Sequence, residues 1–308
     1  MTEAQSIAPN PYAIRNLRDR TRFWWEQPNS ENQIANVDDQ ATREAALALR
    51  DDGIAVLEGF VSSALCDDIN RDFMEFCSQN KTESDHWRLP TGFHPRLTNF
   101  HTYSAAAREA LMSGQLTAVL DALFGEKTAL CSSLYFEQST EQPIHRDSPF
   151  FCSNPYGRFF GVWIALEDIR PQAGPLNYRP GGHKLDIDQV ELALQNPDLD
   201  VGQLYGKYLQ EIKQRCDDEG LPVSTVLPKK GDVAIWHPEL PHGGGKILDG
   251  GGSRKSIVYH VMPETAPIYG IDIFFGRREV ADSGLPLVDC SFGRKMLDQG
   301  SPAFAPNL

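Results

Sequence analysis

Two histidines and an aspartate have the residue types and the spacing of an iron(II) site. His145 and Asp147 are two residues apart in the β-type segment PIHRDSPFF, and His242 follows the strand-like run GDVAIW much further along the chain. Residues two apart on a strand point to the same side, so His145 and Asp147 can bind one ion while Arg146 points away. A returning strand must then bring His242 opposite them. Two histidines and one carboxylate leave three positions open on iron(II), enough for a chelating co-substrate and dioxygen.

A second triplet of the same kind competes with this assignment. In a chain with eight histidines and 42 acidic residues, a histidine followed two residues later by an acid also arises by chance, and His237-Pro238-Glu239 is such a case. Pro238 cannot donate to a sheet ladder, and His237 and His242 share the turn-rich loop WHPELPHGGG, which is less suited to a rigid metal site. We therefore favour the HRD segment at 145–147 over this triplet.

A cation and a hydroxyl follow the third histidine at a spacing that suits a carboxylate. Arg254 and Ser256 are two residues apart in the predicted strand SRKSIVYHV, so both side chains are expected on one face. A guanidinium binds a carboxylate through two parallel N–H bonds, and a neighbouring hydroxyl adds a third bond. We expect this pair to hold the carboxylate of a co-substrate beside the metal.

These side chains need a β scaffold, and the middle of the chain has the pattern of one. Between residues 128 and 180, short β-rich runs alternate with turn residues, which is typical of an antiparallel sandwich or barrel. A polar, helix-forming stretch at 186–218 interrupts the pattern, and we interpret it as an insertion that serves as a lid. The other predicted elements are helices at 38–50, 63–77 and 104–124, strands at 54–60 and 269–276, and a loop at 80–101.

The chain is expected to form one domain with two flanking segments. Residues 1–37 are polar and contain several prolines, and they are typical of an arm that docks through its aromatic residues at 23–25. Residues 38–265 make up the single predicted domain. Residues 266–308 are expected to form a C-terminal extension that packs on this domain.

Composition and charge are typical of a soluble globular chain and limit the classes of partner that it is expected to bind. The 308 residues are 41% hydrophobic and 23% charged, which allows a sizeable core. Acidic residues outnumber basic ones by 42 to 29, and the resulting net charge of −13 disfavours nucleic acid and membranes as partners. Six scattered cysteines and the absence of an export signal lead us to expect a cytoplasmic protein that binds a small molecule. The sequence leaves a homo-oligomer open.

The order and spacing of these motifs resemble one enzyme family. The segments HRD at 145–147, GPLNYRPGGHK at 174–184 and KKGDVAIWHPELPHGGG at 229–245, followed by an arginine, are similar to those of the phytanoyl-CoA dioxygenases. Members of that family use iron(II), 2-oxoglutarate and dioxygen, and the resemblance covers residues 40–265. It implies a mainly β fold whose core is a double-stranded β-helix, a cupin-like jelly roll, with flanking N-terminal helices and a helical insertion.

The same resemblance implies a role for each candidate residue. The His-Asp-His triad would bind iron(II), and Arg254 the distal carboxylate of 2-oxoglutarate. Trp163 occupies the place of a tryptophan that lines the co-substrate pocket in many relatives. Many relatives also have a serine two residues after the second histidine; this chain has Gly244 there, and we expect Ser256 to take over that role. Related halogenases replace the acid of the triad by glycine or alanine, which Asp147 excludes.

Together these inferences predict a dioxygenase. Such an enzyme would oxidise, most simply hydroxylate, an unactivated C–H bond of a mid-sized organic substrate such as a secondary metabolite, and would release succinate and carbon dioxide. Desaturation, ring formation and epoxidation use the same chemistry, and the residues do not choose among them. Two other classes stay open: a cupin-like metal oxygenase or isomerase that does not use 2-oxoglutarate, and a non-catalytic jelly-roll binding module.

Overall fold

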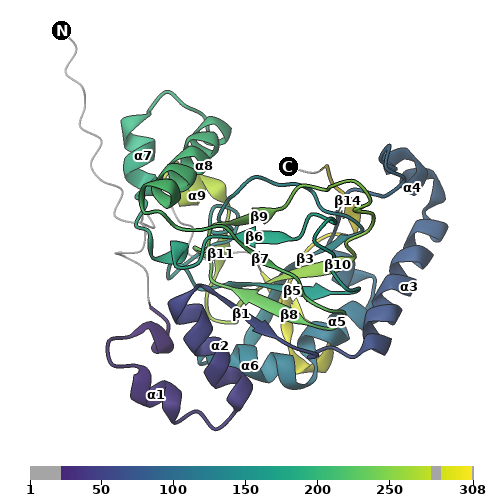
Figure 1. The fold of residues 1–308 in the computed structure, drawn as a ribbon, viewed down its shortest axis with the longest axis horizontal. Helices are drawn as coiled ribbons and strands as arrows, with labels where there is room; N and C mark the ends of the chain where they lie inside the picture. Colours follow the sequence, from purple (N-terminus) through teal and green to yellow (C-terminus); the bar gives the residue numbers. More distant parts are fainter. Residues whose placement is uncertain (1–21, 279–285, 307–308) are drawn as a thin grey trace.

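Two mainly antiparallel sheets face each other at the centre of the computed structural model, which describes residues 22–278 and 286–306 (Figure 1). The large sheet consists, in spatial order, of β1 (Ile54–Leu57), β8 (Val233–Trp236), β5 (Phe160–Ala165), β10 (Ser256–Pro263), β3 (Thr128–Phe136), β13 (Lys295–Leu297) and β12 (Leu287–Asp289). The small sheet consists of β7 (Ser224–Val226), β6 (Leu176–Tyr178) and β9 (His242–Gly244). Facing antiparallel sheets of this kind form a jelly roll, so the predicted double-stranded β-helix is confirmed.

The large sheet is apolar on both faces because helices cover one face and the small sheet covers the other. In β5, Val162 and Ile164 belong to an apolar cluster shared with the helices, while Trp163 and Ala165 belong to a second cluster shared with the small sheet. This is the side-chain alternation of a strand, and every residue of β5 is buried. Side chains that point toward the small sheet, such as Trp163, are therefore the ones that can line a site between the sheets.

Helices cover the outer face of the large sheet, and a second group lies beside the small sheet (Figure 1). The first group comprises η1 (Trp24–Glu26), α1 (Glu31–Ala35), α2 (Gln40–Asp51), α3 (Ser63–Gln79), α4 (Lys81–Trp87), η2 (Phe100–Thr102), α5 (Ala105–Met112), α6 (Gly114–Phe124) and η4 (Ser291–Gly293). The second comprises η3 (Gly182–Lys184), α7 (Gln189–Gln195), α8 (Val201–Asp218) and α9 (Ile271–Phe274). Within the described residues, no helix has both the length and the apolar character that a bilayer span requires.

The helical region upstream of β3 differs from its prediction in two places. The single helix expected at 104–124 is two helices, because Gly114 adopts a left-handed backbone conformation (φ 69°) at the start of α6. The loop expected at 80–101 contains α4 and the short strand β2 (Leu97–Thr98), which pairs with β3 and with β14 (Ala303–Phe304). The edge of the large sheet is thus extended by segments from both ends of the chain.

The region after residue 265 contains more regular structure than the sequence suggested. The strand expected at 269–276 is wrong beyond Tyr269: β11 (Ile268–Tyr269) pairs with β4 (Cys152–Ser153), and the chain then forms α9. Phe274 of α9 packs edge-on against Tyr208 of α8, with ring centroids 5.2 Å apart. A short apolar run does not distinguish a strand from a helix by pattern alone, and here the packing against α8 favours the helix. Three short strands, β12 to β14, also lie within the segment expected to form the C-terminal extension.

A fully buried ion pair ties the HRD segment to the loop of the third candidate ligand. Nη1 of Arg146 donates to Oε2 of Glu239 at 2.9 Å, and both side chains are only 1% exposed. Glu239 stands three residues before His242 and also accepts from the hydroxyl of Tyr156 at 2.8 Å. The second amino group of Arg146 donates to two backbone carbonyls around η3, at 3.0 and 2.9 Å. The Arg146 side chain therefore points away from His145 and Asp147 and anchors their segment on the opposite side.

Glu239→Leu should destabilise the protein by roughly 3 to 5 kcal/mol, because it leaves the Arg146 guanidinium buried without a counter-charge. The double variant Arg146→Met/Glu239→Leu leaves no unpaired charge at these two positions, so its loss should be smaller than the sum of the two single losses. Urea unfolding of the parent, both single variants and the double variant measures these free energies. Strictly additive losses would contradict the coupling.

Candidate metal centre

The two candidate histidine ligands are held side by side by their own backbones. His145 and His242 form an isolated antiparallel bridge, in which the N–H of His145 donates to the carbonyl of His242 at 2.8 Å and the reverse bond is 2.9 Å. Their imidazole rings lie 4.4 Å apart, centre to centre. β9, which begins at His242, also pairs with β6. The bridge thus joins the HRD segment to the small sheet.

Each of these imidazoles has one nitrogen committed to the backbone. Nδ1 of His145 is 2.9 Å from the carbonyl of Pro143, and Nδ1 of His242 is 2.9 Å from the carbonyl of Leu240. Because a carbonyl only accepts, each Nδ1 carries the proton and each Nε2 keeps a free lone pair. Both Nε2 atoms face Asp147, at 3.5 Å from Oδ1 for His145 and 3.7 Å from Oδ2 for His242. This is the tautomer and orientation that a metal-binding histidine needs.

Asp147 reaches the histidines through a turn and not through a strand. The strand predicted over 143–151 is wrong, because only His145 is paired there, through its single bridge. The carbonyl of Asp147 accepts from the N–H groups three and four residues later, at 2.9 and 3.2 Å, and Pro149 has no N–H for a ladder. The indole Nε1 of Trp236 donates to Oδ2 of Asp147 at 2.8 Å and fixes the carboxylate. The side chains of His145 and Asp147 meet as expected, but a turn brings them together instead of a strand.

Burial and neighbouring charges keep Asp147 and His242 in the protonation states that bind metal. Burial alone would raise the pKa of Asp147, but the imidazoles of His242, His145 and His260 outweigh it and hold this pKa well below 3.8. Burial lowers the pKa of His242 to about 4, so its ring is neutral at pH 7. Carboxylates and neutral imidazoles are the forms that metal ions bind. The ligand atoms of the triad lie within 4.8 Å of one another, and the described part of the chain holds no second such group of histidine, cysteine and acidic side chains.

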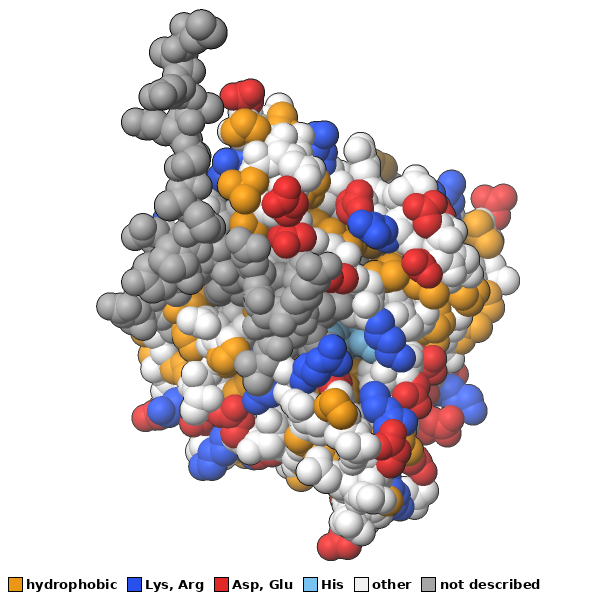
Figure 2. Space-filling model, turned by 90° about the vertical axis from the view of Figure 1, so that its left-hand side faces the viewer, with side chains coloured by type: hydrophobic (Ala, Val, Ile, Leu, Met, Phe, Trp, Pro, Cys, Tyr) orange, Lys and Arg blue, Asp and Glu red, His pale blue; other side chains and the backbone are white. Residues whose placement is uncertain are grey.

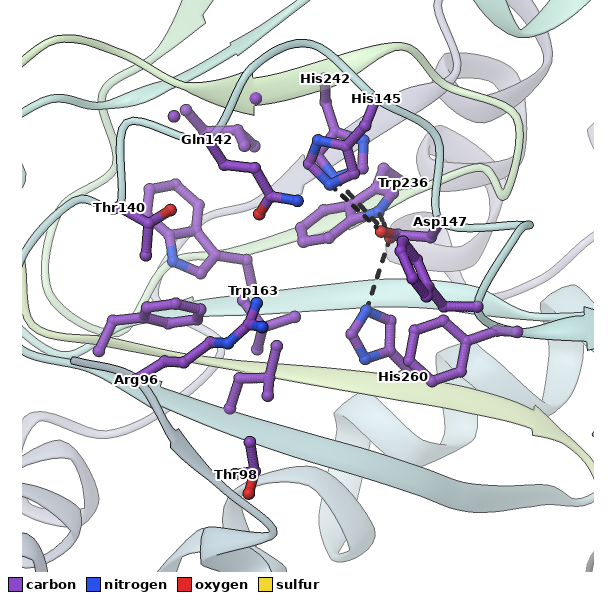
Figure 3. A pocket seen from close by; sticks show the side chains of 18 of the residues that line it. Arg96, Thr98, Thr140, Gln142, His145, Asp147, Trp163, Trp236, His242 and His260 are labelled. Carbon is purple, nitrogen blue, oxygen red and sulfur yellow. Dashed lines mark hydrogen bonds and ion pairs between the residues drawn. The ribbon is translucent and has the colours of Figure 1, made fainter. Parts of the chain in front are cut away.

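The triad lines a cavity of about 260 Å³ between the two sheets (Figure 3). Most of its wall is apolar or aromatic; within the described residues, Asp147 is its only acid, and its arginines are Arg96 and Arg254. The lining residues are Arg96, Thr98, Leu134, Phe136, Thr140, Gln142, His145, Asp147, Phe150, Phe151, Trp163, Leu176, Trp236, His242, Gly243, Gly244, Arg254, Val258 and His260. The cavity therefore combines a metal-binding cluster, two guanidinium groups and apolar surface.

The structure places Arg254 and Trp163 at this cavity, whereas Ser256 is not among the residues that line it. The guanidinium of Arg254 lies 5.6 Å from the centre of the Trp163 ring and donates to the carbonyl of Gly174 at 3.0 Å, while its buried Nε has no hydrogen-bond partner. Burial lowers the pKa of Arg254 to about 10, which leaves it charged at pH 7. β10 begins at Ser256, so Arg254 lies outside the strand in which it was predicted. The Ser256 hydroxyl donates to the carbonyl of Arg254 at 3.3 Å and does not line the cavity.

The competing triplet has partners of its own away from the cavity. Glu239 is paired with Arg146, and Nε2 of His237 lies 3.5 Å from a carboxylate oxygen of Glu26. Neither His237 nor Glu239 lines the cavity. Although His237 and His242 share one loop, their side chains serve different sites.

Two residues of the site were not anticipated from the sequence. Nε2 of His260 lies 3.5 Å from Oδ2 of Asp147, and its Nδ1 lies 2.9 Å from the hydroxyl of Ser132. His260 is four residues after Ser256 on β10, so the strand alternation already applied to Arg254 and Ser256 could have found it. Arg96 precedes β2 in a segment that was predicted to be a loop, and no periodic pattern marks it.

The chain is similar in sequence to characterised proteins over part of its length. Phytanoyl-CoA dioxygenase domain-containing protein 1 of Danio rerio is 25% identical over 166 residues, which are 53% of this chain and 54% of that protein. The peroxisomal phytanoyl-CoA dioxygenase of Rattus norvegicus is 29% identical over 124 residues, 40% of this chain and 34% of that protein. The chain thus spans about half, or less, of the length of the curated relatives it matches.

Solved structures share the fold at lower sequence identity. The non-heme alpha-ketoglutarate-dependent carbocyclase SnoK from nogalamycin biosynthesis has a TM-score of 0.58 at 15% identity, over 82% of this chain and 95% of that chain. EctD from S. alaskensis, solved with 2-oxoglutarate and 5-hydroxyectoine, has a TM-score of 0.55 at 17% identity, over 83% and 88%. These likenesses extend beyond the sheets to most of the chain.

A comparison with a family model relates most of the site to one family. The match to the family described as phytanoyl-CoA dioxygenase (PhyH) covers residues 49–256. This range runs from the end of α2 to the start of β10, and it includes the His-Asp-His triad, Trp163 and Arg254. The chain therefore belongs to the phytanoyl-CoA dioxygenase family.

Proposed function

We propose that this chain is an iron(II)- and 2-oxoglutarate-dependent dioxygenase that oxidises, most simply hydroxylates, an unactivated C–H bond of a mid-sized organic substrate and releases succinate and carbon dioxide. One observation carries the proposal: a His-Asp-His cluster faces the same cavity as Arg254, which has no acidic partner among residues 22–278 and 286–306. Membership of the PhyH family supports it, as does a solved protein of this fold described as alpha-ketoglutarate dependent.

The donor set of the triad fits iron(II). His145 and His242 each direct Nε2 toward the site while Nδ1 donates to a backbone carbonyl, and Asp147 offers a carboxylate whose Oδ2 accepts from the indole of Trp236. Two imidazoles and one carboxylate on one face of the ion leave the opposite face to ligands that are not part of the protein. We therefore assign iron(II) to these three side chains.

The surroundings of Arg254 fit the distal carboxylate of 2-oxoglutarate. A guanidinium binds a carboxylate with two parallel bonds, and among the described residues Arg254 donates a single side-chain hydrogen bond, to a backbone carbonyl. The Trp163 ring lies against the guanidinium and closes one side of this part of the cavity. Ser256 supports the same group indirectly, since its hydroxyl binds the Arg254 carbonyl.

Iron(II) and 2-oxoglutarate, when bound, supply the oxidation of a C–H bond by dioxygen. The residues of this chain hold and orient the reactants. The backbone bridge and Trp236 fix the three ligands, and Arg254 sets the direction of the co-substrate. The apolar wall, with Phe151 and Leu134 among its residues, excludes water and leaves the substrate as the nearest group to oxidise.

The helical insertion is our candidate for the substrate-selecting lid. The ring of Tyr205 on α8 contacts that of Phe150 edge-on, with centroids 5.1 Å apart, and Phe150 lines the cavity at a 36% exposed position. Excursions of this length from a rigid barrel are often functional. We therefore assign α7 and α8 to the recognition of the substrate.

His145→Ala and Asp147→Ala should each abolish the formation of succinate from 2-oxoglutarate, because each removes one of three metal ligands. Succinate is measured with iron(II), 2-oxoglutarate and air, and circular dichroism checks the fold of each variant. His86→Ala, at an exposed histidine on α4, is the matched control and should behave as the parent does. Succinate formation that persists in a folded His145→Ala variant would move the metal to other residues.

Arg254→Ala should raise the 2-oxoglutarate concentration for half-maximal succinate formation about ten- to a hundredfold, because a charge-assisted hydrogen bond contributes roughly 1.5 to 3 kcal/mol. Arg71→Ala, at a largely exposed arginine on α3, is the control. An unchanged 2-oxoglutarate requirement would remove Arg254 from the co-substrate site. It would then favour a cupin-like enzyme that uses the same metal ligands without this co-substrate.

A further inference from the structure

Four residues of the large sheet lie in one row across four neighbouring strands. Trp236 on β8 is opposite Gly161 on β5, and Gly161 is opposite His260 on β10. His260 is in turn opposite Ser132 on β3, and the pairing of these two strands shifts by one residue directly after His260. Directly opposed residues of antiparallel strands point to the same face of a sheet, and Trp236 and His260 both line the cavity. The row thus directs an indole and an imidazole to the same side.

These two rings converge on the carboxylate of Asp147. Nε1 of Trp236 donates to Oδ2 at 2.8 Å, and Nε2 of His260 lies 3.5 Å from the same oxygen (Figure 3). Gly161 makes room for the indole, since a Cβ there would lie 2.0 Å from it. The other carboxylate oxygen, Oδ1, faces Nε2 of His145 at 3.5 Å. One oxygen of Asp147 therefore faces the large sheet, and the other faces a histidine of the triad.

Three contacts hold the ring of His260 in this orientation. Besides Asp147, the Ser132 hydroxyl lies 2.9 Å from Nδ1, and the Phe151 ring stacks on the imidazole with centroids 3.9 Å apart. Phe151 belongs to the turn of Asp147, because its N–H donates to the Asp147 carbonyl at 3.2 Å. A carboxylate only accepts, so the ring offers it the proton on Nε2, and Nδ1 accepts from Ser132. The turn therefore holds the imidazole that its own aspartate faces.

His260 is not placed as a fourth metal ligand. The ligand atoms of the triad lie within 4.8 Å of one another, and among residues 22–278 and 286–306 His260 belongs to no such group. A fourth protein ligand would also occupy one of the three positions that two histidines and a carboxylate leave open on the ion. His260 therefore acts on the carboxylate and not on the ion.

Asp147 differs from acids on the surface in the kind of partner that it has. Acidic and basic side chains are interspersed on the face drawn in Figure 2, and exposed acids such as Asp85 and Asp217 pair with lysines. Asp147 is 5% exposed, and within the part of the chain that the structure describes no lysine or arginine lies at ion-pair distance from it. A lysine or arginine would cancel the charge that attracts a metal ion, whereas an indole N–H orients the carboxylate and leaves that charge available.

We propose that His260 is a positioning residue of the metal centre: together with Trp236 it occupies Oδ2 of Asp147 and leaves Oδ1 to bind the metal. Nδ1 carries the proton in His145 and in His242, so neither ring competes for Oδ2 as a donor. The small sheet thus holds the two histidine ligands through β9, and two strands of the large sheet hold the aspartate. The proposal rests on the metal assignment of the proposed function and does not depend on the co-substrate.

Metal affinity tests the role of His260. Cobalt(II) is titrated into metal-free protein in competition with a chelator of known affinity, and circular dichroism checks the fold of each variant. His260→Leu should lower the affinity about ten- to a hundredfold, the usual effect of losing a group that orients a metal ligand. His260→Gln, whose amide presents an N–H in place of Nε2, should regain most of this loss. His86→Leu, at an exposed histidine on α4, should bind cobalt(II) as the parent does.

A double-variant cycle separates this role from packing. Ser132→Ala removes the partner of Nδ1 and should lower the cobalt(II) affinity of the parent about three- to tenfold. In the His260→Leu background the same change should have no effect, because Ser132 acts on the carboxylate only through the ring. Equal effects in both backgrounds would overturn the proposal. A folded His260→Leu variant that binds cobalt(II) as tightly as the parent would overturn it as well.

A count of bound imidazoles distinguishes a positioning residue from a ligand. Pulsed electron paramagnetic resonance of the copper(II)-loaded protein detects each imidazole on the ion through its remote nitrogen. The parent and His260→Gln should both show two imidazoles. Three in the parent and two in the variant would overturn the proposal and make His260 a ligand. A parent that binds neither iron(II) nor cobalt(II) would contradict the proposed function, and the role of His260 with it.

Discussion

The antiparallel bridge between His145 and His242 is the contact on which the candidate metal centre depends. Its two backbone hydrogen bonds set the separation of the imidazoles, and two further bonds to backbone carbonyls fix the tautomer of each ring. A single hydrogen bond contributes only about 1 kcal/mol net, so the bridge alone is a weak fastening. The buried pair of Arg146 and Glu239 joins the same two segments on the opposite side and makes their arrangement rigid.

The described residues that line the cavity include more basic than acidic side chains, whereas the whole chain is acidic. The protein is acidic overall, yet its cavity holds two arginines and a single carboxylate that faces the histidines. Burial is the common cause of the altered pKa values there: it keeps His242 neutral and weakens the hydration of both guanidinium groups. A site of this kind is prepared for a cation held by the triad and for anionic ligands held by the arginines. The electrostatics, the metal ligands and the family membership therefore point to the same chemistry.

The sequence predicted the types of residue in the site better than the geometry that unites them. The spacing of His145 and Asp147 is sufficient to nominate them, but it predicts a strand there, whereas a turn and the indole of Trp236 hold Asp147. Trp236 can reach it because Gly161 stands opposite on β5, where a Cβ would lie 2.0 Å from the indole. Such tertiary contacts leave no local pattern. Arg96 was missed for the same reason, since only the pairing of β2 with β3 brings it to the cavity.

The central claim is that the triad and Arg254 together hold iron(II) and 2-oxoglutarate, and an anaerobic titration tests it most directly. Iron(II) and then 2-oxoglutarate are added to metal-free protein, and the weak visible charge-transfer band of the chelate is recorded, with His242→Ala as control. Our account predicts the band in the parent and its absence in the variant. A parent that binds one iron(II) per chain but develops no band on addition of 2-oxoglutarate would contradict it.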